Sequence, residues 1–117
     1  MRNFCELTIW KNGINIAKKV YSLAELLPVH EKYGLKSQIC RAAVSIPSNI
    51  AEGHIRRSDK VFANHLDIAL GSSAELDTQL EIAVDVGYLK PEIYQTLTAE
   101  LQEIMKMLRG LLKAVSR

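Results

Sequence analysis

The sequence predicts an all-α protein, a single domain over residues 1–117 that folds as an up-down-up-down four-helix bundle. Apolar residues recur at spacings of three and four in four successive segments, which is the period of amphipathic helices. The segments are joined by short connections, roughly residues 28–33, 54–58 and 87–90, which make sequential helices antiparallel neighbours. A chain of 117 residues, 48% hydrophobic and 24% charged, suffices for one core and has the composition of a globular protein.

The first two helices are predicted from apolar lines that end at helix-breaking residues. The line of the first helix stops before Pro28, and Gly53 closes the second. Pro47 lies inside the second line and lacks the amide that would bond the Ala43 carbonyl, so we expect helix 2 to be kinked there. The two lines are Leu7, Trp10, Ile14, Ala17, Tyr21 and Ala24, and Leu35, Ile39, Ala42, Ile46 and Ile50.

The third and fourth helices carry longer apolar lines. Ser58 is a good N-cap and Gly87 a good stop, so the third helix is expected at about 59–86, and Pro91 suits the first turn of the fourth. Their lines are Phe62, Leu66, Ala69, Ser73, Leu76, Leu80 and Ala83, and Tyr94, Leu97, Leu101, Ile104, Leu108, Leu111 and Val115. The residues predicted to be mostly buried are Trp10, Ile14, Tyr21, Ile39, Ile46, Leu66, Leu76, Leu80, Leu101, Ile104 and Leu108.

The third helix has two further features. Gly71 lies in its middle, where glycine costs about 1 kcal/mol relative to alanine, and we expect it to allow a close helix approach or to make room for Trp10 or Tyr21. A second apolar line flanks the main one. It is either a broad core stripe or an exposed band for self-association, and the sequence favours neither. Its members are Val61, Ile68 and Ile82, with Met105 and Leu112 in the same relation on the fourth helix.

The run from Tyr33 to Ser58, YGLKSQICRAAVSIPSNIAEGHIRRS, is distinctive. It resembles the signature of the four-helix-bundle family encoded in intervening sequences of bacterial 23S rRNA genes, sometimes labelled a ribosomal protein. The resemblance extends through LTIWKNGINIAKKVYSL and FANHLDIALGSSAELDTQLEIAVDVGYL, nearly the whole chain. His54 and Ile55 depart from it, since members often have Phe or Tyr and Gly or Ser there.

The resemblance implies a bundle of uncharacterised function and no established enzymatic activity. The family is similar in turn to the accessory variability-determinant protein of diversity-generating retroelements, a homopentamer that engages a reverse transcriptase and RNA. The resemblance therefore implies a homopentamer with a link to RNA.

The charge is divided unevenly along the chain. Residues 1–60 carry ten Lys/Arg and five Asp/Glu, a net charge of +5, and residues 61–117 carry five and eight, a net charge of −3. A basic half suits a polyanion or an acidic neighbour, although an ordinary solvated surface gives the same count. The candidate nucleic-acid-binding residues are the cations around the second helix: Arg41, Arg56, Arg57, Lys60, Lys32 and Lys36.

These cations predict phosphate contacts rather than base recognition. Arginine forks onto phosphate, and a helix start at Ser58 adds free N–H groups. No aromatic residues interleave with the cations, so stacking of bases is not expected. Arg56 and Arg57 have the alternative of pairing with Glu52 or Asp59, or with a neighbouring subunit.

The sequence contains no recognisable catalytic or cofactor-binding pattern. It has no P-loop and no Ser/His/Asp set, and no Glu-x-x-His motif accompanies the acidic turns of the third helix. We expect no enzymatic activity, no cofactor and no metal. His30, His54 and His65 are expected to be surface or cap residues.

The N-terminal segment indicates a compartment. It has no continuous apolar region of the kind found in signal peptides, and no run in the chain approaches the ~18 apolar residues of a membrane span. We expect a cytoplasmic protein with no membrane contact, in which Cys5 and Cys40 are reduced thiols.

Two functions fit these observations. The first is a non-enzymatic, RNA-binding homo-oligomer, expected to be a homopentamer that contacts structured RNA. The second is a protein-interaction scaffold that engages a protein partner and has no direct role with RNA.

Overall fold

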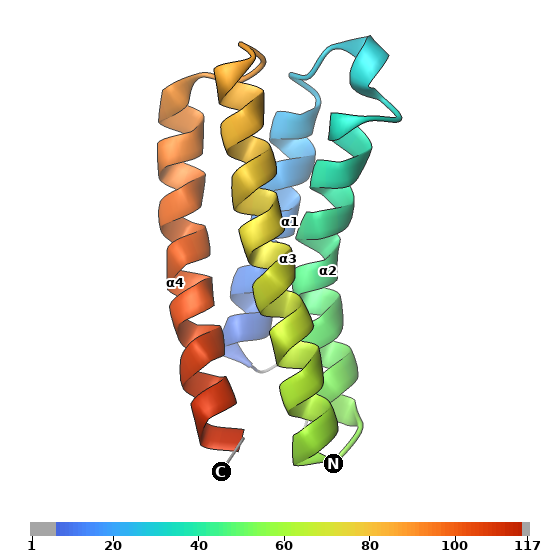
Figure 1. Ribbon diagram of the computed structural model, residues 1–117, viewed down its shortest axis with the longest axis vertical. Helices are drawn as coiled ribbons and strands as arrows, with labels where there is room; N and C mark the ends of the chain where they lie inside the picture. The colour runs from blue at the N-terminus through green and yellow to red at the C-terminus, as the bar shows by residue number, and fades with distance from the viewer. Residues whose placement is uncertain (1–6, 116–117) are drawn as a thin grey trace.

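The computed structural model describes residues 7–115 and confirms the four-helix bundle. The helices are α1 (Thr8–Ala24), α2 (Leu35–Ile55), α3 (Asp59–Asp85) and α4 (Pro91–Val115), with a short 3-10 helix, η2 (Val29–Glu31), in the first connection. Successive helices run in opposite directions along the long axis (Figure 1). None of the helices in this part of the chain is long and apolar enough to cross a bilayer.

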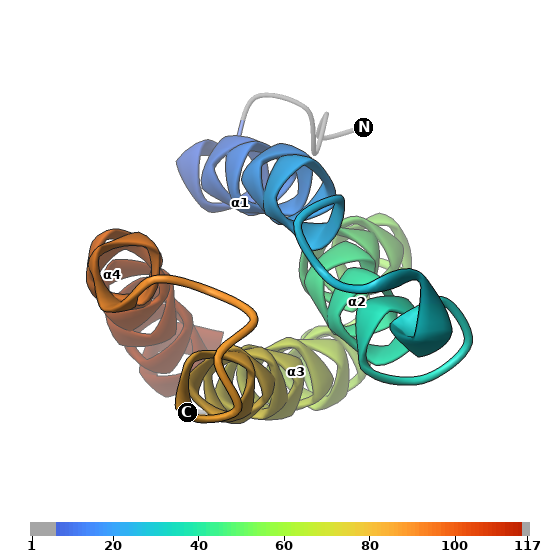
Figure 2. The same ribbon diagram turned by 90° about the horizontal axis from the view of Figure 1, so that it is seen from above.

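The helices stand in sequence order around one core. Viewed along the bundle, each helix lies beside the next, and α4 closes the ring beside α1 (Figure 2). The α2–α3 pair has the most extensive contact and the α1–α4 pair the least. The α2–α3 pair is therefore the most extensively packed pair of the bundle.

The predicted core of α2, α3 and α4 is confirmed. Eight of the residues expected to be buried have at most 1% of their surface exposed: Ile39, Ile46, Leu66, Leu76, Leu80, Leu101, Ile104 and Leu108. The boundaries of α3 also follow the expectation, because the Ser58 hydroxyl accepts a hydrogen bond from the Val61 amide at 3.2 Å, and Gly87 has φ +88°. α4 begins at Pro91 as predicted.

The buried face of α1 differs from the prediction. Tyr21 is 53% exposed, while Trp10 and Ile14 are only partly buried. The buried residues of α1 are Ile9, Gly13, Ile16, Ala17, Val20, Leu23 and Ala24, of which the predicted line contained only Ala17 and Ala24. The line Ile9, Gly13, Ile16, Val20 and Leu23 also has spacings of four and three, but it passes through a glycine, so hydrophobicity alone favoured the wrong stripe.

Gly13 is buried in the core because it packs against Pro47 of α2. A Cβ built on Gly13 would lie 3.2 Å from the Cβ of Pro47, closer than ordinary side-chain contacts. The absence of a side chain lets α1 pack directly on the proline ring. α2 continues as helix through Pro47, and the kink expected there stays a prediction.

Two other glycines were misread in the sequence. α2 continues past Gly53, which is buried within the helix and does not end it. Gly71 is exposed, and an added Cβ would have no atom within 4 Å, so it neither permits a close approach within the bundle nor accommodates a ring. Ile68 and Ile82, on the same helix, are 50% and 46% exposed, so this part of the second apolar line lies at the surface.

Candidate nucleic-acid interface

The packing of the bundle turns the uneven charge of the sequence into two sides. α1 and α2 are neighbours and belong to the basic part of the chain, and α3 and α4 belong to the acidic part. α1 itself contains three lysines and no acidic residue. The six candidate cations belong to the basic part: Lys36 and Arg41 lie on α2, Lys32, Arg56 and Arg57 lie in the connections at its two ends, and Lys60 lies in the first turn of α3.

The candidate cations form two groups rather than one. Arg41 and Arg56 are fifteen residues apart on α2, which corresponds to about 22 Å along the helix axis. Arg56, Arg57 and Lys60 lie at the α2–α3 corner, defined here as residues 56–60. Arg41 instead shares a surface groove with Lys32 and Lys36 near the other end of α2. The structure thus separates Arg41 from Arg56 and Arg57, with which it was grouped as a candidate site.

At the α2–α3 corner, the backbone is unusual at Arg57. Its φ of 58° lies in the left-handed region, which is costly for a residue with a side chain. Arg56, just before it, is in helical conformation and pairs with Glu52 at 3.3 Å, one of the alternatives that the sequence left open. Both side chains of that pair are more than half exposed, so the pair contributes little to stability. Lys60, the second residue of α3, is exposed.

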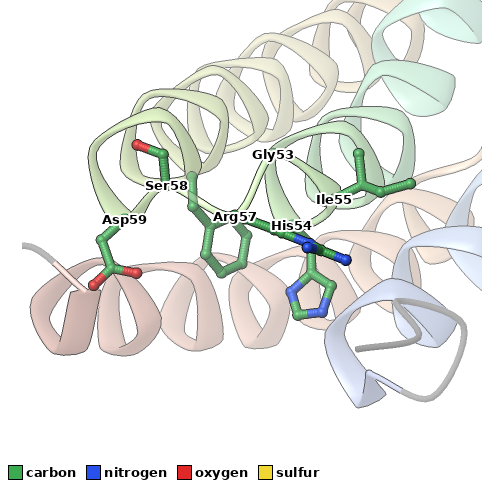
Figure 3. A pocket seen from close by; sticks show the side chains of 7 residues that line it. Gly53, His54, Ile55, Arg57, Ser58 and Asp59 are labelled. Carbon is green, nitrogen blue, oxygen red and sulfur yellow. The ribbon is translucent and has the colours of Figure 1, made fainter. Parts of the chain in front are cut away.

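A small cavity of about 120 Å³ opens at this corner. Figure 3 shows His54, Arg57 and Asp59 among the residues around it. His54 was expected to be a surface or cap residue but is only 7% exposed, and its ring packs edge-to-face on Phe62 with centroids 5.4 Å apart. An aromatic ring at this position packs the end of α2 against α3, which accounts for the Phe or Tyr that the resemblance places there.

The second group lines a larger hollow between α1 and α2, called here the tyrosine groove. It has a volume of about 630 Å³ and is lined by Tyr21, Lys32, Tyr33, Lys36, Ser37, Cys40, Arg41, Val44 and Ser45. Lys36 pairs with Glu25 at 3.3 Å, and the Lys32 ammonium lies 5.4 Å from the centre of the Tyr33 ring. Arg41 donates a hydrogen bond to the Ser37 hydroxyl at 3.3 Å.

Sequence reasoning missed the two tyrosines. Tyr21 was assigned to the core through the wrong stripe of α1, and Tyr33, which lies between Lys32 and Lys36, was overlooked in the expectation that no aromatic residue interleaves with the cations. The usable signal was the position of Tyr33 in a connection, between Lys32 and Gly34, where a large ring has no core to enter. Cys40 is a free thiol in the same groove, and burial raises its pKa, so it stays protonated at neutral pH. Cys5 lies outside the described residues.

The remaining histidines, His30 and His65, make structural contacts. His65 shares a hydrogen bond with the Asn49 side chain at 2.9 Å, and His30 lies 3.2 Å from the Tyr88 hydroxyl. Within residues 7–115, no cluster of three or more His, Cys, Asp or Glu side chains is arranged to hold a metal ion.

Comparison with known proteins identifies the family. The model of the 23S rRNA-intervening sequence protein family matches residues 5–110. The chain belongs to this family. It is also similar to a crystal structure of a protein of unknown function from the S23 ribosomal protein family of Bacteroides thetaiotaomicron, with 27% sequence identity and a TM-score of 0.84. The match covers 91% of this chain and 99% of that one. A search of curated proteins finds no match.

The segment that resembles the 23S rRNA-intervening sequence family most distinctly joins α2 to α3. Ser45 and Ser72 share a hydrogen bond at 2.8 Å, and Asn49 bonds His65 one turn further along. Gly53 then lets α3 approach α2 closely. These residues are therefore explained by helix packing, and the functional surface has to be sought among the exposed side chains around them.

Proposed function

We propose that this member of the 23S rRNA-intervening sequence family is a non-enzymatic RNA-binding protein that acts as a homo-oligomer. The observation that carries the proposal is the segregation of charge, with the basic part of the chain, net +5, gathered on α1, α2 and their connections. A one-sided positive surface attracts a polyanion and orients it. Because the family is associated with ribosomal RNA genes, we propose that this polyanion is structured RNA.

At the α2–α3 corner, three features favour phosphate. Arg56, Arg57 and Lys60 are all exposed. Arg56 is held only by a solvated pair with Glu52, which a phosphate can replace at little cost. Arg57 keeps a long charged side chain at a backbone position where glycine is the better residue. An arginine at such a position is consistent with a role for its guanidinium.

A charge-matched comparison tests RNA binding. The double variant Arg56→Gln/Arg57→Gln removes two cations from the corner, and Lys106→Gln/Arg109→Gln removes two exposed cations from α4. We expect structured RNA to bind the corner variant at least about tenfold more weakly than wild type, and the α4 variant almost normally. Equal loss in both variants would mean that binding follows net charge and not the corner.

Self-association is proposed through the outer face of α3. Ile68 and Ile82 lie two heptads apart, so they share one face, and both are about half exposed. Gly71 between them leaves open space above the helix, where a helix of a second copy fits closely. We propose five subunits because of the resemblance to the homopentameric accessory variability-determinant protein.

Light scattering tests the assembly. Ile68→Lys/Ile82→Lys should dissociate the oligomer, whereas Val29→Lys, at an 89% exposed position in η2, should leave it intact. A wild-type protein that is monomeric at micromolar concentration would contradict self-association. If that monomer also fails to bind RNA and copurifies with another protein, the scaffold function, in which the α3 face engages a protein partner, replaces the RNA-binding one.

A further inference from the structure

The tyrosine groove combines exposed aromatic rings with cations. Tyr21 belongs to α1, Tyr33 to the connection before α2, and Lys36 and Arg41 to α2, so only the fold brings them together. We propose that this groove binds an unpaired segment of RNA, with bases stacked on the tyrosine rings and phosphates held by the cations. The inference rests on the proposed function and adds to it a site and the form of RNA recognised.

The tyrosine rings are presented to solvent in a way that suits stacking. Tyr33 is 88% exposed and Tyr21 53% exposed, although aromatic rings are usually buried for much of their area. A base stacked on such a ring contributes between about 5-fold and 150-fold in affinity, and any base can do so because each has a π-face. The Lys32 ammonium near Tyr33 adds a charge beside that surface.

The cations are placed to follow a strand along α2. Lys36 and Arg41 are five residues apart, about 7.5 Å along the helix axis, so each can reach a different phosphate. Neither is committed to a strong partner. The Glu25 side chain paired with Lys36 is 75% exposed, and the bond from Arg41 to the Ser37 hydroxyl at 3.3 Å is long. Both can exchange their present contacts for phosphate oxygens.

The groove between α1 and α4 differs from the tyrosine groove in the charge of its lining residues. That groove has a similar volume, about 600 Å³, but Glu92 and Glu100 line it, and Lys19 is paired with Glu100. Its charge does not favour a polyanion. In the tyrosine groove all charged lining residues are cations: Lys32, Lys36 and Arg41.

The stacking surfaces select an unpaired strand over a duplex. In a duplex the base faces are already stacked on one another, so a protein ring has no access to them, and recognition is limited to the backbone and groove edges. The α2–α3 corner, which lacks an exposed tyrosine among residues 56–60, is the contrasting site. Duplex binding should therefore depend on the corner and unpaired binding on the groove.

Fluorescence anisotropy with two labelled probes tests the inference: an oligouridylate of about 12 nucleotides and an RNA duplex of about 16 base pairs. The variant Tyr21→Leu/Tyr33→Leu removes both rings, and Tyr21→Phe/Tyr33→Phe keeps them. We expect the Leu variant to bind oligouridylate at least about tenfold more weakly, with duplex binding unchanged, and the Phe variant to bind both like wild type. Both positions are exposed, so we expect each variant to fold, and circular dichroism is the control for folding.

Three results would overturn the inference. If the Leu variant binds oligouridylate as tightly as wild type, the groove is not the site. If it changes the oligomeric state while keeping its affinity for both probes, the groove is a contact between subunits. Wild type that binds the duplex but not oligouridylate removes the groove alone, and wild type that binds neither probe removes the proposed function together with it.

Discussion

Gly53 of α2 lies against His65 of α3 so closely that a Cβ added to the glycine would be 2.5 Å from the Cβ of His65. That atom is fixed to the backbone and cannot swing aside as the end of a long side chain can. His65 is held in addition by its hydrogen bond to Asn49 at 2.9 Å. The contact sets the distance between the two helices that carry the α2–α3 corner.

Gly53→Ala should therefore destabilise the protein although alanine is the better helix former. Overpacking costs about 1–3 kcal/mol, which outweighs a propensity gain of about 1 kcal/mol only if α2 and α3 cannot separate. We expect a net loss of about 1 kcal/mol or more in the free energy of unfolding, measured with urea. Gly110→Ala on α4, where an added Cβ has no atom within 4 Å, is the control and should stabilise or be neutral.

Leu76→Ala tests the core of α3. The side chain is fully buried, so removing it leaves a cavity and should lower the free energy of unfolding by about 2–5 kcal/mol. Leu26→Ala removes the same atoms at a 59% exposed position and should cost under about 1 kcal/mol. Similar losses in the two variants would mean that the α3 seam is not the core of the protein in solution.

Arg57→Gly should stabilise the protein while weakening RNA binding. Glycine has no steric penalty at a φ of 58°, so the free energy of unfolding should rise by about 1 kcal/mol. Arg56→Gly removes the same charge at a helical φ of −74° and should destabilise by a similar amount. Urea unfolding of both variants decides it, and a destabilised Arg57→Gly would show that the left-handed residue is not strained.

The contacts between η2 and the α3–α4 connection predict a pH dependence. The Leu35 amide and the Tyr88 hydroxyl each donate to Glu31 at 3.0 Å, and these two bonds lower the pKa of Glu31 from its ordinary 4.5. A lowered carboxyl pKa gives stability that is present above 4.5 and lost as pH falls through the folded value. The same bond to Glu31 raises the pKa of Tyr88, so its contribution is present below 10.0 and lost at higher pH.

Tyr88→Phe removes this bond and makes the dependence measurable. The difference in unfolding free energy between wild type and variant should be constant near neutral pH and should shrink as the solution is made acidic. A difference that persists unchanged in acid would show that the bond between Tyr88 and Glu31 does not form in solution.

The fold follows from the sequence wherever one apolar stripe dominates. Leu76 and Leu80 lie on the only strong seam of their segment, and both were placed correctly in the core. In α1 two stripes compete, and the correct one passes through Gly13, whose value depends on a proline in another helix. A pattern within one segment does not contain that contact, so Tyr21 was assigned to the wrong face.

The candidate site shows the same limit. The cations are visible in the sequence, but their division between the corner and the groove depends on the length of α2, about 22 Å from Arg41 to Arg56. The partnership of Tyr21 with Tyr33 and Lys36 needs the packing of α1 on α2. Charge was therefore predictable from composition, and the grouping of charge with aromatic rings was not.

The salt dependence of RNA binding tests the central claim, that the basic side of the bundle contacts phosphates through the α2–α3 corner. For each phosphate neutralised in a duplex, the slope of log affinity against log salt steepens by about 0.9, because counterions are released. Arg56→Gln/Arg57→Gln should therefore flatten the slope by about two, or more in an oligomer that repeats the change in every subunit, and Lys106→Gln/Arg109→Gln should leave it unchanged. A folded and assembled corner variant with the affinity and slope of wild type would contradict the claim.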